Sequence, residues 1–156
     1  MLWVTGTNDF AYPLPSLQKS YRLARGQRTL AIRVRMKHSH PDGATPEEIA
    51  AYAESIFRKG TPMPRIVESA SDVVGYKAKG RVVRAELNYT NDQGRWQDRK
   101  WESVPAELDT KRRRVAAAVP PGATAWYINL FDERGLVVSS EHHTETGKQT
   151  VRAIGN

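Results

Sequence analysis

An acid and two imidazoles follow short strand-like runs near the start of this chain. Asp9 follows the apolar run 2–5 and a turn of small residues, and His38 and His40 follow the alternating run 29–36. Residues just past the end of a strand are well placed for chemistry, because loops on a rigid scaffold carry many catalytic groups. A carboxylate that orients an imidazole prepares it to act as a general base. Asp9, His38 and His40 are therefore the candidate catalytic residues, and the pattern leaves open which histidine is the base.

The elements that would position these residues alternate between strand and helix. Residues 2–5 and 29–36 predict strands, and the alternation of apolar and basic residues in 29–36 predicts burial of one face only. Residues 13–23 lie between them with apolar residues at helical spacing. Two strands joined by a helix predict a right-handed parallel βαβ unit.

A second helix is predicted directly after the histidine loop. Thr45 would cap it, Pro46 would take its first position, and Glu48 would complete a capping box. The helix should end at residues 58–60. Its apolar residues are expected to point inward, namely Ile49, Ala53, Ile56 and Phe57. Residues 1–60 thus predict a βαβα arrangement.

The pattern changes after a proline-rich linker at residues 60–64. Short strand candidates separated by turn residues predict an immunoglobulin-like β-sandwich over residues 65–145, with its tryptophans and tyrosines in the core. The polar tail 146–156 is expected to be flexible. The fold class is therefore α/β plus all-β. The strand candidates are 73–79, 82–89, 95–103, 113–119, 125–132 and 137–141.

Composition limits the functions open to the chain. Its 156 residues contain no cysteine, which excludes disulfides and thiol catalysis. No secretory signal or membrane span is visible, so a cytoplasmic protein is expected, although a longer parent could be exported. The net charge of +7 is concentrated in residues 19–37 and in 111–114. These runs lack any nucleic-acid recognition motif and are interpreted as solvated faces, so neither nucleic acid nor membrane is an expected partner.

Three stretches of the sequence carry a resemblance to a known family. Residues 2–13, LWVTGTNDFAYP, resemble the acid-bearing strand of bacterial serine α/β-hydrolases of the acetylxylan-esterase and dienelactone-hydrolase kind. Residues 36–40, MKHSH, resemble their histidine loop, and residues 125–141 resemble a β-sandwich that some of them append. The resemblance implies the C-terminal part of such an enzyme, with Asp9 orienting His38 or His40. It also implies a small ester or lactone as substrate.

The nucleophile that such an enzyme needs is not evident in the sequence. No Gly-x-Ser-x-Gly motif occurs, and none of the nine serines stands between glycines at a strand-to-helix turn. Whether the chain is an enzyme therefore stays open. One reading is an ester or lactone hydrolase that acts weakly or through a site completed by oligomerisation or a metal. The alternative is a non-catalytic module whose β-sandwich binds a carbohydrate, a protein or a polyanion.

The remaining expectations concern cofactors and self-association. Glu141, His142 and His143 are ligand types for a divalent metal, as are His38 and His40. The sequence indicates no third ligand for the His38–His40 pair, and no cofactor is predicted. A two-stranded parallel unit exposes a sheet edge and an apolar face. A homo-oligomer formed through the N-terminal region is therefore expected.

Overall fold

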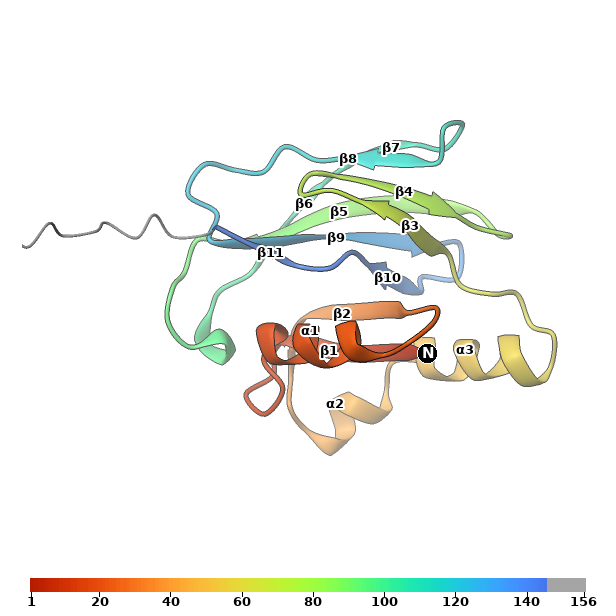
Figure 1. Ribbon diagram of the computed structural model, residues 1–156, viewed down its shortest axis with the longest axis horizontal. Helices are drawn as coiled ribbons and strands as arrows, with labels where there is room; N and C mark the ends of the chain where they lie inside the picture. The colour runs from red at the N-terminus through yellow and green to blue at the C-terminus, as the bar shows by residue number, and fades with distance from the viewer. Residues whose placement is uncertain (146–156) are drawn as a thin grey trace, which may run out of the picture.

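The computed structural model describes residues 1–145, which form a mostly β-sheet structure with its helices near the N-terminus (Figure 1). The N-terminal elements are β1 (Leu2–Asn8), α1 (Leu14–Leu23), β2 (Thr29–Lys37), α2 (His40–Ala44) and α3 (Glu47–Phe57). β1 and β2 pair in parallel, which confirms the predicted parallel strand pair. The expected flexible tail, residues 146–156, lies outside the described residues.

Two antiparallel sheets follow the N-terminal elements. One has the strand order β10-β9-β5-β6, with β11 also paired to β9, and the other has the order β3-β4-β8-β7. Their strands are β3 (Arg65–Ser69), β4 (Val73–Lys77), β5 (Val82–Thr90), β6 (Glu102–Pro105), β7 (Glu107–Asp109), β8 (Arg114–Ala116), β9 (Ala125–Asp132), β10 (Val137–Ser139) and β11 (His143–Thr144).

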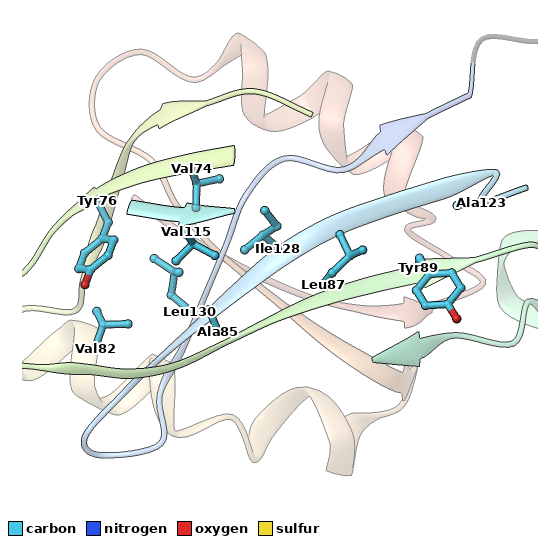
Figure 2. Close-up of a cluster of buried hydrophobic side chains, with 10 residues drawn as sticks. All are labelled: Val74, Tyr76, Val82, Ala85, Leu87, Tyr89, Val115, Ala123, Ile128 and Leu130. Atoms are coloured by element: carbon cyan, nitrogen blue, oxygen red, sulfur yellow. The ribbon is translucent and has the colours of Figure 1, made fainter. Parts of the chain in front are cut away.

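The core of the sandwich lies between the two sheets. Val74 and Val115 come from one sheet, Leu87, Ile128 and others come from the second, and Figure 2 shows their side chains meeting. A fully buried side chain of this kind contributes roughly 1.5–3 kcal/mol of transfer free energy. The two-sheet architecture agrees with the predicted β-sandwich at this coarse level.

Five of the six predicted strands overlap β4, β5, β8, β9 and β10, whereas β3, β7 and β11 were not predicted. The predicted strand 95–103 is instead a loop containing a short 3₁₀ helix, η1 (Trp96–Asp98), and β6 begins only at Glu102. The side chain of Trp101 is nonetheless buried, as are those of Tyr89 and Tyr127. Aromatic burial was therefore predicted better than the local backbone.

β2 packs directly onto the sandwich. The Ile32 N–H donates to Ser139 Oγ at 2.7 Å, and the Ile32 carbonyl accepts from Asn129 Nδ2 at 3.2 Å. Residues 29–32 are all buried, so the prediction that β2 is covered on one face only was wrong. The sandwich supplies the second cover, and Leu14, Ile32 and Tyr127 belong to one apolar cluster.

The orientation predicted for α3 was also wrong. Pro46 precedes the helix and no side chain caps it, so the capping box does not form. Glu48 is instead fully buried, where it binds Arg33 at 2.7 Å and accepts the Val137 N–H at 2.7 Å. The residues expected to point inward include three with large exposed side chains: Ile49, Ile56 and Phe57. The helix is therefore held by two charge-assisted hydrogen bonds to the buried Glu48 carboxylate, while its large apolar side chains face solvent.

No helix within residues 1–145 is long and apolar enough to cross a membrane.

Candidate functional site

Asp9 lies directly after β1 and is almost fully buried. Its Oδ1 accepts the backbone N–H groups of Ala11 and Tyr12, both at 2.8 Å. An aspartate that accepts nearby backbone N–H groups stabilises a turn, and here the same bonds fix the carboxylate plane. The second oxygen, Oδ2, is left to face the end of β2.

His38 is the histidine that the structure brings to this carboxylate. Its Nδ1 lies 3.1 Å from Asp9 Oδ2, and its side chain is 42% exposed. A hydrogen bond from Nδ1 to a carboxylate favours the tautomer that leaves the Nε2 lone pair unprotonated. No hydrogen bond involving Nε2 of His38 occurs among residues 1–145. The pair therefore has the geometry of an oriented general base.

Two aromatic rings border the imidazole. The Phe10 ring centroid lies 5.2 Å from that of His38, in an edge arrangement, and the Tyr12 centroid lies at 5.6 Å. Both aromatic side chains are themselves exposed. They restrict the imidazole on two sides and provide apolar surface beside it.

A bulge in β2 places His38 opposite Asp9. Between the pairs Gly6–Arg33 and Asn8–Lys37, β1 advances by two residues and β2 by four. Arg35 in this bulge has a φ of 62°, which is uncommon for a residue other than glycine. Thr7 Oγ1 accepts the Arg35 N–H at 2.8 Å and helps to hold that backbone. Bulges beside functional sites re-aim side chains in this way.

Gly6 makes the close approach of the two strands possible. A Cβ on this residue would lie 1.9 Å from the Met36 carbonyl oxygen, far inside contact distance. Any side chain at position 6 would therefore push β2 away from β1. The Asp9–His38 distance depends on this separation, since both residues come immediately after these strands.

His40 is not brought to Asp9. It is the first residue of α2 and is exposed, and no hydrogen bond joins it to Asp9 within the described part of the chain. Ser39, between the two histidines, caps α2 by accepting the Asp42 N–H at 3.0 Å. Its hydroxyl also donates to the Asp42 carboxylate at 2.8 Å. Ser39 therefore serves the helix rather than His38.

The remaining histidines lie apart from this pair. His142 is buried, and its ring centroid lies 5.5 Å from that of Trp96 in an edge arrangement. Burial, together with its neighbours His143 and Arg22, lowers its pKa to about 4. His143 stacks on Trp126, and burial lowers its pKa as well. Among residues 1–145 no group of three or more histidine, cysteine, aspartate or glutamate side chains is placed to hold a metal ion.

A cavity of about 410 Å³ lies between the N-terminal elements and the sandwich. Arg22, Arg28 and Arg65 contribute to its lining, and Glu141 in the same lining forms ion pairs with the first two. Tyr21 also lines it, and burial raises the pKa of its hydroxyl to about 12. Glu68 lies in the lining as well, so the recess has three arginines, two glutamates and a neutral phenol, and the Asp9–His38 pair does not line it.

The sequence identified Asp9 and the histidine loop but not the residues that support them. Gly6 and Thr7 were visible only as members of a small-residue turn, and Arg35 only as one basic residue in an alternating strand. Phe10 directly follows Asp9 and Tyr12 stands three residues after it, and this proximity was the one available signal for them. No protein-family model, curated protein or solved structure matches the chain.

Proposed function

We propose that this chain carries the acid–base pair of a hydrolase that acts on carboxylic esters or lactones. The observation that supports the proposal is the 3.1 Å contact between His38 Nδ1 and a carboxylate whose other oxygen is held by two backbone N–H groups. The resemblance of residues 2–13 and 36–40 to serine α/β-hydrolases gives the reaction class. We also propose that the sandwich is immunoglobulin-like, as the domain that some of these hydrolases append.

His38 would act through Nε2. It takes the proton of an attacking hydroxyl group as the new C–O bond forms at the ester carbonyl, and it then donates that proton to the leaving alcohol. Asp9 holds the ring and stabilises the imidazolium that exists between these steps. The two flanking rings would contact an apolar part of the substrate.

The source of the attacking hydroxyl determines how fast such a reaction could be. No serine hydroxyl within residues 1–145 forms a hydrogen bond with His38. With water as the nucleophile the chain would hydrolyse esters weakly, because a positioned nucleophile and oxyanion donors each provide orders of magnitude in rate. Faster turnover requires that a second subunit or a metal ion complete the site.

The test is hydrolysis of a chromogenic acetate ester and of an acyl lactone by the purified protein, with and without a chelator. His38→Ala and Asp9→Ala should reduce kcat/KM by about 100-fold or more, to the background rate. His40→Ala is the matched control, because this exposed imidazole makes no contact with Asp9, and it should leave the rate unchanged. Equal rates in all four proteins would refute the catalytic role. Loss of turnover with chelator alone would identify a metal.

A non-catalytic binding module is the second candidate, and the cavity lined by three arginines is the observation that favours it. Tyr89, Trp101 and Tyr127 are buried, so they do not form an aromatic platform for a carbohydrate. Arg65 lines the cavity and pairs only with the Gln27 side chain among the described residues. Calorimetric titration with inorganic polyphosphate would show binding that Arg65→Ala weakens and salt suppresses. Equal affinity of the wild-type protein and Arg65→Ala at low salt would remove the cavity as a polyanion site.

A further inference from the structure

A second recess, of about 460 Å³, lies where the loop that contains η1 meets the ends of β1 and β2. Figure 1 shows this loop reaching from the sandwich towards the N-terminal elements. Asn8 holds the two sides together, because its Nδ2 donates to the carbonyl oxygens of Gln97 and Arg99, both at 2.9 Å. Asp9 and His38 do not line the recess, so it is separate from the proposed acid–base pair.

The charged lining of this recess is strongly unbalanced. It consists of four cationic side chains and one carboxylate, namely Arg35, Lys37, Arg99, Lys100 and Glu102. The formal net charge of the lining is therefore +3. None of the four cations forms an ion pair within residues 1–145, whereas Arg22 and Arg28 in the other cavity pair with Glu141. Cations gathered in a concave surface attract anions and concentrate them there.

Backbone carbonyl groups and an aromatic ring hold the two arginines of the recess. Arg35 donates Nη2 to the Trp101 carbonyl oxygen at 2.9 Å. Arg99 donates Nε and Nη2 to the Gly94 carbonyl oxygen at 3.3 and 3.1 Å, and its guanidinium carbon lies 3.9 Å from the Trp96 ring centroid. Each guanidinium keeps nitrogen atoms without a hydrogen-bond partner among the described residues. Groups that are fixed before binding lose less entropy when they bind an anion.

We propose that this recess binds a diphosphate group. The fork of a guanidinium matches the oxygen atoms of a phosphate. A single phosphate monoester carries a charge of about −1.5 to −2 and would leave the lining cationic, whereas two linked phosphates come closer to balancing it. The volume also leaves room for an organic group attached to the diphosphate. The proposal does not rest on the hydrolase function, and it gives Arg35 and Lys37 a role beyond that of a solvated basic face.

Calorimetric titration of the full chain with inorganic pyrophosphate at low salt tests the site. The double variant Lys37→Gln/Lys100→Gln should raise the dissociation constant at least about tenfold, because it removes two of the four cations. Both lysines are exposed and their side chains form no hydrogen bond within residues 1–145, so the fold should be retained, which circular dichroism checks. Lys19→Gln/Lys111→Gln is the matched control, because it removes the same charge from exposed positions outside the recess. It should change the dissociation constant by less than about twofold.

Glu102→Gln should change the affinity in the opposite direction. It removes the one carboxylate of the lining but keeps an acceptor for the Tyr89 hydroxyl, which donates to Glu102 at 2.7 Å. Pyrophosphate should therefore bind this variant about threefold more tightly. Weaker binding by Glu102→Gln would contradict the proposal.

Other ligands identify the chemistry and its source. Inorganic phosphate should bind at least about tenfold more weakly than pyrophosphate, because it carries less charge. Adenosine diphosphate that binds more tightly than pyrophosphate would identify a nucleotide as the source, and weaker binding would identify free pyrophosphate. Absence of pyrophosphate binding, or equal affinity for phosphate, would overturn the proposal. So would pyrophosphate binding that the Lys37→Gln/Lys100→Gln variant leaves intact, or that Arg65→Ala abolishes, since the latter would place the ligand in the other cavity.

Discussion

The sandwich and helix α3 use their large apolar residues in opposite ways. In the sandwich, strands β4, β5, β8 and β9 turn their large side chains into one core between two sheets. In the N-terminal region, α3 turns its large apolar side chains to solvent and buries the carboxylate of Glu48. The difference shows that amphipathic spacing identifies the apolar side of a helix but does not identify what covers it.

The strongest test of the N-terminal region is Gly6→Ala. The new Cβ would meet the Met36 carbonyl at 1.9 Å, so β1 and β2 must separate, and we expect a loss of at least about 4 kcal/mol in the free energy of unfolding. Gly43→Ala in α2 is the control, because nothing lies within 4 Å of its added Cβ. Urea unfolding followed by circular dichroism measures both. Equal stability of the two variants would show that the strands are not so closely paired.

Glu48→Ala tests the connection between the two regions. The change leaves the Arg33 guanidinium and the Val137 N–H without their partner, and breaking a buried charge pair costs about 3–5 kcal/mol. Glu47→Ala, at an exposed neighbouring position, should change stability by less than about 0.5 kcal/mol. Similar urea midpoints for the two variants would mean that Glu48 does not link α3 to β10.

The course of the chain could be predicted where local patterns decide it. The parallel pairing of β1 with β2 followed from two strands joined by one helix, and β5 and β9 followed from their apolar residues and flanking turns. The burial of β2 on both faces could not be predicted, because Ser139 and Asn129 bond to it from far along the chain. Glu48 was assigned to a local cap for the same reason: its partners at positions 33 and 137 are distant in sequence.

The candidate site was predictable as a set of residues but not as a geometry. Asp9 and the histidine loop stood out because each follows a strand. The choice of His38 over His40 depends on the bulge in β2, and Arg35 at positive φ gives no sign of that bulge in the sequence. Asparagine or glycine is the usual indicator of such a backbone, and neither occupies this position.

A pair of isoleucine substitutions compares a buried side chain of the sandwich core directly with an exposed one on α3. Ile128→Ala in the sandwich core, where the side chain is 1% exposed, should cost about 2–5 kcal/mol. Ile56→Ala on α3 removes the same atoms from a side chain that is 57% exposed, and should change the monomer's stability by less than about 0.5 kcal/mol. Thermal unfolding at low protein concentration gives both values. A large cost at position 56 would indicate a partner already present at that concentration.

His142 makes the stability of the folded chain sensitive to acid. Its pKa is about 4 when folded, below the ordinary value of 6.5, so the unfolded chain binds more protons between these limits. Stability should therefore be complete above pH 6.5 and decline as the pH falls towards 4, by at most about 3 kcal/mol. His142→Gln should flatten this part of the stability profile, and His40→Gln, at an exposed position, should not. Parallel profiles for the two variants would contradict the assignment.

The smallest expected effect on stability comes from two residues whose backbone has a positive φ angle, one in each region. Lys59, just past the end of α3, has a φ of 55°, and Gly135, in the turn between β9 and β10, has a φ of 82°. Lys59→Gly should stabilise the protein by up to about 1 kcal/mol, because glycine adopts this conformation without a Cβ penalty. Gly135→Ala should destabilise it by a similar amount for the same reason. Opposite shifts in the melting temperature are expected, since the turn already has the favoured residue and the end of the helix does not. Shifts of the same sign would mean that the lost Lys59 side chain matters more than its backbone.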